Sequence, residues 1–296
     1  MKESNPFIDG MKEAFPRPAR GFWQSAARVT VGVTIVAFWV IVPVMGLFAY
    51  LFFTDDYEDY DTENFEETAQ CNVYAERIHG ALDIYTQPSS DDGYVVVGSD
   101  DIVFNIEAAA NDDSVKGVLL DIDSPGGSPV AADEVAKALQ ALDKPSVAVI
   151  HGYGDSAAYW AATGADVIFA SPISDVGSIG VTQSYLENVE YNTKEGFMYQ
   201  QLSVGKYKDA GDPDKPLTPE EKQLAMKQLE FIYDYFVNVV ATNRDIPVAD
   251  VKKIATGQSF LGGEALKLKL IDQLGGLPEA TTWLEKQIGA KPEFCW

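Results

Sequence analysis

The sequence predicts an α/β domain with a mainly parallel sheet, preceded by one membrane-spanning helix. Apolar or β-branched segments alternate with amphipathic helical segments from about residue 73 to residue 296, and this alternation is typical of parallel sheets with helical connections. Residues 115–122 (VKGVLLDI) form a nearly continuous apolar run, as expected for a strand covered on both faces. Residues 29–53 contain no charged side chain in 25 positions, which is long enough for a helix to cross a bilayer core.

A basic segment, residues 1–28, precedes the uncharged run. It contains five Lys or Arg residues and three acidic ones, and such a flank stays in the cytoplasm. We therefore expect one pass through the cell (inner) membrane, with lipid around residues 29–53 and everything after Phe53 extracytoplasmic. Trp23 and Tyr50 are placed as interfacial anchors. A buried soluble helix and a cleaved signal peptide are the alternatives, but a signal peptide has an apolar core of only ~7–15 residues and a small-residue cleavage site.

Residues 54–72 predict an acidic, flexible stalk, because they lack apolar periodicity and their like charges repel one another. Cys71 ends this stalk, and Cys295 is the only other cysteine of the chain. The two could pair in an oxidising compartment, but their separation along the chain says nothing about their distance in space. The sequence leaves this pairing open.

The folded domain, residues 73–296, should contain its elements in a regular order. A strand at 94–97 leads into a helix capped by Ser99, the strand at 115–122 into a helix at 130–142, and a strand at 146–150 into an Ala-rich helix from about Ser156. A strand at 166–170 comes next. Thr218-Pro219-Glu220-Glu221 is a capping box with Pro at the first helical position, so a helix should begin there and end near Asn243. Two more short helices are expected after it.

Composition restricts the function. The 22 Lys and Arg residues and 45 Asp and Glu residues give a net charge of -23. This excludes a general nucleic-acid binder, because phosphate contacts need clustered basic side chains. One Cys/His zinc site would need both cysteines and both histidines of the chain, so no metal is expected, and no cofactor.

The first segment with candidate chemistry is Asp123-Ser124-Pro125-Gly126-Gly127-Ser128, between the buried strand and a helix. Paired glycines allow positive φ angles and leave backbone N–H groups unobstructed. Such donors, near the positive end of a helix, can hold a developing oxyanion. The alternative is a plain tight turn.

The second segment is Gly154-Asp155-Ser156-Ala157-Ala158, again between a strand and a helix. This edge of the sheet is where α/β proteins place their ligands. The segment nearly matches the Gly-x-Ser-x-Gly nucleophile elbow, with Ala158 in place of the last glycine. The alternative is that Ser156 only caps the helix.

A nucleophilic serine needs a base, and the sequence favours lysine over histidine. An α/β-hydrolase places its histidine after the nucleophile, but both histidines precede Ser156, and His151 fits a structural role. The third segment, residues 205–211 (GKYKDAG), contains Lys206 and Lys208. A lysine can act as a base where burial or a nearby positive charge lowers its pKa. Spacing alone does not choose between the two, and both could be ordinary exposed loop residues.

Four stretches of this chain, in order and spacing, resemble the signal peptide peptidase A (SppA) family, the S49 family of membrane serine peptidases with a Ser/Lys dyad. They are VKGVLLDIDSPGGSPVAADEV, GDSAAYWAATGADVIFASPISDVGSIGV, GKYKDAGDPDKPLTPEE and GQSFLGGEALKLKLIDQLGG. The resemblance covers about residues 75–290 and is to the short, single-repeat, membrane-anchored form. It implies a ClpP/crotonase-like fold for residues 73–296, a ring-shaped homo-oligomer, and endopeptidase activity on apolar peptides such as remnant signal peptides.

The resemblance also implies roles for five residues. The nucleophile falls on Ser156 and the general base on Lys208, the lysine before Asp in GKYKD. An oxyanion-hole donor falls on Gly127, with the N–H of Ala157 as its partner. Ser178 resembles the hydroxyl that orients the lysine. In a ring, the serine and the lysine of one site could come from neighbouring subunits.

The nucleophile motif departs from the family pattern. Members usually carry Ser-Gly-Gly-Tyr, whereas this chain has Ser156-Ala157-Ala158-Tyr159, preceded by Asp155. Alanine resists positive φ angles, and a carboxylate beside the nucleophile disfavours an oxyanion. Two alternatives therefore stay open. The first is a non-catalytic membrane scaffold of the same fold. The second is a crotonase-like acyl-CoA enzyme, although so acidic a domain is a poor environment for the phosphates of CoA.

Overall fold

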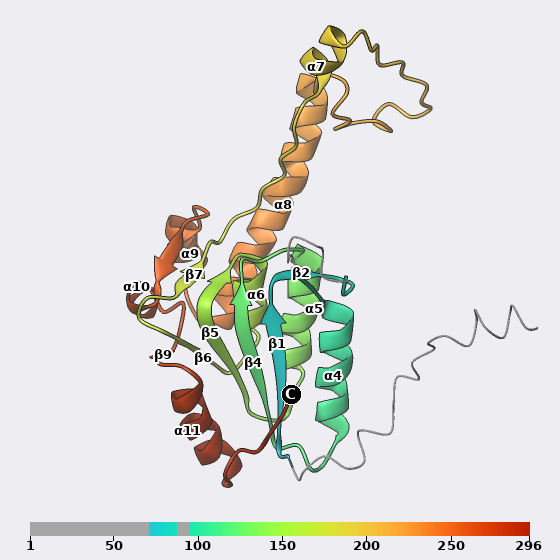
Figure 1. Ribbon diagram of the computed structural model, residues 1–296. Helices are drawn as coiled ribbons and strands as arrows, with labels where there is room; N and C mark the ends of the chain where they lie inside the picture. Colours follow the sequence, from blue (N-terminus) through green and yellow to red (C-terminus); the bar gives the residue numbers. More distant parts are fainter. Residues whose placement is uncertain (1–70, 88–94) are drawn as a thin grey trace, which may run out of the picture. The chain divides into compact units, whose positions relative to one another are not determined.

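The computed structural model describes residues 71–87 and 95–296 (Figure 1). The predicted membrane helix at 29–53 and the predicted stalk up to residue 70 lie outside these ranges, so they stay predictions. Among the described residues, no helix is both long enough and apolar enough to span a bilayer.

The domain is built on a mainly parallel sheet, as predicted. Its strands lie in the order β10-β1-β4-β5-β6-β9, with every pairing along this path parallel. β7 pairs with the end of β5, β8 runs antiparallel to β7, and β2 and β3 form a separate pair. The strand bounds are β1 Val73–His79, β2 Ala81–Asp83, β3 Val96–Gly98, β4 Gly117–Ser124, β5 Ser146–Asp155, β6 Val167–Ala170, β7 Asp175–Gly177, β8 Ser259–Leu261, β9 Gln273–Leu274 and β10 Phe294–Cys295.

Helices cover both faces of this sheet (Figure 1). On one face, residues of α4, α5, α6 and α8 pack against Leu120 and Ile122 of β4. On the other face, α11 packs against Leu119. Adjacent residues of a strand point to opposite faces, and this double covering explains why β4 reads as a continuous apolar run. The helix bounds are α4 Ser99–Asn111, α5 Pro129–Gln140, α6 Ala157–Ala162, α7 Val189–Lys194, α8 Pro219–Asn243, α9 Val248–Ile254, α10 Gly262–Lys267 and α11 Leu277–Ile288.

Three details of the predicted elements were wrong. Gly98, not Ser99, occupies the N-cap position of α4, and the Ser99 hydroxyl instead donates to Glu134 at 2.6 Å. β5 continues past Ile150 to Asp155, because the glycine-containing segment after Ile150 pairs with β7 rather than forming a turn. In the described part of the chain, three helices rather than two follow α8.

Cys71 and Cys295 form a disulfide, with their Cα atoms 5.6 Å apart. It joins the start of β1 to β10, where Val73 lies opposite Phe294 in the sheet. The start of β1 and the strand β10 near the end of the chain are therefore side by side. Disulfides of this kind persist in oxidising compartments.

Residues 185–230, which we call the arm, comprise α7, the loop after it and the N-terminal half of α8. The C-terminal half of α8 is anchored by buried Phe236, Val237 and Val240, whereas Glu221 alone is buried in the first half. Figure 1 shows the other parts of the arm beside the start of α8. Several large apolar side chains of the arm are exposed: Leu186, Tyr191, Phe197, Met198, Leu202, Val204 and Met226.

Candidate active site

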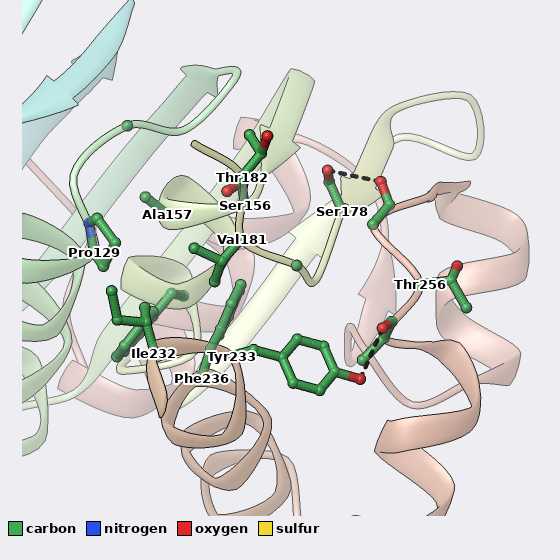
Figure 2. Close-up of a pocket in the computed structure, with 15 residues that line it drawn as sticks. Pro129, Ser156, Ala157, Ser178, Val181, Thr182, Ile232, Tyr233, Phe236 and Thr256 are labelled. Carbon is green, nitrogen blue, oxygen red and sulfur yellow. Dashed lines mark hydrogen bonds between the residues drawn. The ribbon is translucent and has the colours of Figure 1, made fainter. Parts of the chain in front are cut away.

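A cavity of about 510 Å³ opens where β4, β5 and β7 end. Four of the five predicted site residues line it: Gly127, Ser156, Ala157 and Ser178. Figure 2 shows Ser156, Ala157 and Ser178 around this cavity. Parallel strands bring their carboxyl ends to one edge of the sheet, which is why segments about 50 residues apart in sequence meet here.

Ser156 lies in a strained turn between β5 and α6. Its φ and ψ angles are 53° and -121°, a region that few residues other than glycine occupy. The Ser156 N–H donates to the carbonyl of Gly177 at 2.8 Å, and its carbonyl accepts from the N–H of Trp160 at 3.0 Å. These contacts hold the turn. The hydroxyl does not cap α6, so the capping alternative is wrong for this residue.

Gly126 and Gly127 form the turn beside Ser156, and neither position has room for a side chain. Gly126 has a φ of 107°, and a Cβ there would lie 2.8 Å from the Cβ of Ser156. A Cβ on Gly127 would collide with the carbonyl oxygen of Leu82. The neighbours of Gly127 are fixed by β2, since Leu82 N–H donates to Gly126 O at 2.9 Å and Ser128 N–H donates to Leu82 O at 2.7 Å.

These contacts leave the N–H of Gly127 without a backbone partner in the described part of the chain. Ala157 is the first residue of α6, and the first N–H groups of a helix have no partner inside it. Both residues line the cavity that Ser156 faces. Two backbone donors are thus available beside one hydroxyl, which is the composition of an oxyanion hole.

The two alanines after Ser156 fit their positions. Ala157 and Ala158 are helical and buried, and the positive φ angle falls on Ser156 itself. The backbone strain that alanine resists is therefore not required at either position. Both alanines belong to the buried cluster that contains Tyr159, whose hydroxyl donates to the carbonyl of Leu270 at 2.8 Å.

Ser178 lines the same cavity and directly follows β7. It also has a positive φ angle, 48°, and its N–H donates to the carbonyl of Gln258 at 3.1 Å. Its hydroxyl donates to the carbonyl of Gly257 at 3.1 Å (Figure 2). The side chain is therefore held at the cavity wall, where its oxygen can still accept a hydrogen bond from an approaching donor.

Asp155, next to Ser156, is tied to β8. Its carboxylate accepts a hydrogen bond from the hydroxyl of Ser259 at 2.8 Å. Burial raises the pKa of Asp155, and the nearby charge of Asp175 adds to this effect, while the bond from Ser259 acts against it.

Lys208 does not line the cavity. It is an exposed residue of the arm, in the loop between α7 and α8. None of the described residues that line the cavity is a lysine. A lysine base for Ser156 would therefore have to reach the cavity from another copy of the chain or after a movement of the arm.

Sequence reasoning missed the apolar wall of the cavity. This wall comes from α6 and α8 and comprises Trp160, Ile232 and Phe236. Figure 2 shows Ile232 and Phe236, with Tyr233 beside them. Trp160 and Phe236 are stacked with ring centroids 4.8 Å apart, and the Tyr233 hydroxyl donates to the carbonyl of Ala255 at 3.0 Å. The apolar periodicity of α8 could have indicated this wall, but the same periodicity is expected for a helix that only packs on the core.

Both histidines lie away from this cavity and have a structural partner. His151 contacts the buried carboxylate of Asp121, and the His79 Nε2 lies 3.3 Å from the other oxygen of the same carboxylate. The structural interpretation of His151 agrees with this arrangement. In the described residues, no group of His, Cys, Asp and Glu is arranged to hold a metal ion.

Comparison with known proteins decides the family. Residues 138–291, more than half of the chain, match the model of peptidase family S49. The chain belongs to peptidase family S49. A "Putative protease" of Methanocaldococcus jannaschii is 33% identical over 260 residues, which make up 86% of this chain and 81% of that protein.

Longer proteins also match this S49 chain. The "Serine protease SPPA, chloroplastic" of Arabidopsis thaliana is 30% identical over 207 residues, 69% of this chain and 30% of that protein. "Protease 4" of Haemophilus influenzae is 28% identical over 199 residues, 66% of this chain and 32% of that protein. The matched part of the chain thus covers about one third of the length of each of these two relatives. S49 membership makes the chain a protease, and its substrates are peptides.

Proposed function

We propose that this S49 protease is a membrane-anchored serine endopeptidase in which Ser156 and Lys208 form the catalytic dyad, and that it hydrolyses apolar peptides such as remnant signal peptides. The observation that carries the proposal is the strained Ser156 turn, which faces a cavity beside the N–H groups of Gly127 and Ala157. A hydroxyl with two convergent backbone donors is equipped for acyl transfer.

In the proposed mechanism, Lys208 in its neutral form takes the proton from the Ser156 hydroxyl. The Ser156 Oγ then attacks the peptide carbonyl, and the N–H groups of Gly127 and Ala157 stabilise the oxyanion, each by about 3–4 kcal/mol. Lys208 gives its proton to the departing amine as the C–N bond breaks. A water molecule, deprotonated by Lys208, then hydrolyses the ester, and the proton returns to Ser156. Ser178 orients the lysine.

The lysine of each site is proposed to come from a neighbouring subunit of a ring. Lys208 is on the arm and does not line the cavity of its own chain. The arm also exposes large apolar side chains, with Leu202 97% and Val204 98% exposed. Contiguous exposed apolar surface is typical of a protein interface. An arm docked on the next subunit would cover this surface and remove Lys208 from water, which favours its neutral form.

The proposed substrates follow from the cavity and from the predicted anchor. Trp160, Ile232 and Phe236 provide an apolar wall that fits an apolar side chain of a peptide beside Ser156. A membrane helix at residues 29–53 would hold the site near the bilayer and raise its effective concentration for membrane-associated peptides. The Cys71–Cys295 disulfide supports an extracytoplasmic, oxidising location for the domain.

The test uses the full chain purified in detergent, with the variants Ser156→Ala and Lys208→Ala and a fluorogenic apolar peptide. Each variant should lose at least about 10³-fold in kcat, since the members of a catalytic unit act together. Lys194→Ala removes an exposed lysine of the arm that is paired with Glu190; it is the matched control and should keep wild-type activity. Wild-type turnover by Ser156→Ala or by Lys208→Ala would remove that residue from the mechanism.

A fluorophosphonate probe separates this proposal from the scaffold alternative. The probe should label Ser156 in the wild-type chain and leave Ser156→Ala unlabelled. Absence of labelling in an assembled wild-type protein would favour a non-catalytic scaffold.

A further inference from the structure

The residues that flank Lys208 in the sequence have hydrogen-bond partners within the arm. On one side, Lys206 Nζ and the Tyr207 hydroxyl both reach Oε1 of Glu220, at 2.5 and 2.6 Å. On the other side, Asp209 accepts a hydrogen bond from the Tyr199 hydroxyl at 3.1 Å. Lys208 itself has no side-chain partner among the described residues. The flanking residues are held while the lysine between them points into solvent.

A second set of contacts connects Asp209 to the capping box of α8. Lys215 Nζ lies 3.9 Å from Oδ1 of Asp209 and 2.5 Å from Oε1 of Glu221. Glu221 in turn accepts from the N–H and the hydroxyl of Thr218, at 2.9 and 2.8 Å. Side chains 209, 215 and 221 are only 12%, 14% and 6% exposed. Most charged side chains on a surface loop are not buried in this way.

Tyr199 and Glu221 each keep one protonation state near neutral pH. Hydrogen bonds from Lys215 and Thr218 lower the pKa of Glu221 to about 2. Loss of contact with water and the carboxylate of Asp209 raise the pKa of Tyr199 to about 12. Tyr199 therefore remains a donor and Glu221 remains an ionised acceptor near neutral pH.

We propose that Asp209 is a positioning residue, which with Tyr199, Lys215 and Glu221 forms a clamp that presents Lys208 to the nucleophile. The proposal rests on the proposed function, because it needs Lys208 to be the base. A base must be held within hydrogen-bond reach of its proton, and a long lysine side chain on an unrestrained loop would lose rotational freedom each time it entered the site. The clamp fixes the backbone beside Lys208 before the arm meets its partner.

The test compares Asp209→Ala and Asp209→Asn with Lys208→Ala in the full chain, with kcat and KM measured on the same peptide. Asp209→Ala should lower kcat about 100-fold, the effect of a catalytic group displaced by about 1 Å. KM should stay within about twofold, because Asp209 does not touch substrate. Asp209→Asn keeps an oxygen that can accept from Tyr199 and should restore part of the loss.

Glu190→Gln is the matched control. This variant also removes one carboxylate of the arm, because Glu190 forms an exposed ion pair with Lys194 on α7. It should leave kcat and KM at wild-type values. Hydrogen exchange of residues 205–211 should become faster in Asp209→Ala and stay unchanged in the control.

The outcomes separate the clamp from the dyad. If Lys208→Ala is active, the dyad is wrong and the clamp is wrong with it. If Lys208→Ala is inactive but Asp209→Ala has wild-type kcat, the clamp alone is wrong. If Asp209→Ala fails to assemble, Tyr199→Phe decides, because it removes only the donated hydrogen bond to Asp209; a wild-type kcat in that variant would overturn the proposal.

Discussion

The proposed nucleophile and its proposed oxyanion donors are positioned by backbone geometry at single residues. Ser156 has a positive φ angle, and Gly126 must lack a side chain because Ser156 lies against it. The strain and the close approach occur at the same place, so each depends on the other. Strain of this kind persists only where surrounding contacts enforce it.

Gly126→Ala tests this dependence. The new methyl group would lie 2.8 Å from the Ser156 Cβ, so the turn must shift, and we expect kcat to fall about 100-fold. Gly289→Ala is the control: its φ is also positive, at 69°, but no atom lies within 4 Å of the added Cβ. It should cost about 1–2 kcal/mol of stability and leave kcat unchanged. Equal kcat values for the two variants would contradict the steric argument.

Asp155 makes stability depend on pH. Because burial raises its pKa, the folded state prefers the protonated acid. This contribution to stability is fully present below the ordinary pKa of 3.8 and is lost as the pH rises through the raised value. Asp155→Asn keeps an acceptor for Ser259 without the charge. It should raise the melting temperature at pH 7 and match the wild type below pH 3.8 in scanning calorimetry. A lower melting temperature at pH 7 would show that the ionised carboxylate stabilises the fold.

The motifs and the family resemblance together predicted four residues that line one cavity. Ser156, Gly127, Ala157 and Ser178 each follow a strand, and parallel strands bring such positions together. The position of Lys208 could not be predicted in this way, because it belongs to a loop between two helices that no strand places.

At the scale of elements, the helices and strands that were predicted most accurately are those whose ends are marked by characteristic residues. Both ends of α8 were predicted, since Pro219 and the Thr218–Glu221 capping box mark its start. β7, β8 and β9 have two or three residues each, too few to show a period of two. Their pairing depends on partners distant in sequence, and only the structure reveals these.

The Cys71–Cys295 disulfide is the element-scale feature with the largest expected effect on stability. It closes a loop across 224 positions, and removing such a bond costs about 2–5 kcal/mol. The double variant Cys71→Ser with Cys295→Ser should therefore unfold at lower denaturant concentration, and a reducing agent should give the wild-type chain the same midpoint. Identical midpoints for the oxidised wild type and the variant would mean that β10 and the bonds of Asn72 to Glu293 hold this edge alone.

At the scale of the whole molecule, the two proposed catalytic groups lie in different parts of the chain. Ser156 lies in the α/β body, whereas Lys208 lies on an arm with exposed Leu202 and Val204. In the proposed ring, docking of the arm would bury its apolar side chains and would also bring the lysine to the serine. Cyclic assemblies repeat one head-to-tail contact around the ring, so every subunit would give an arm to one neighbour and receive one from the other.

Mixing two inactive variants tests this arrangement. A ring assembled from Ser156→Ala and Lys208→Ala subunits contains complete sites wherever an intact arm docks on an intact serine. Random mixing in equal amounts makes this true of about one quarter of the sites in a head-to-tail ring, so peptidase activity should return to about that fraction of wild type. The two variants must be unfolded or dissociated and reassembled together, and each variant treated alone is the control. If the dyad formed within one chain, mixing would restore nothing, because no subunit would hold both groups.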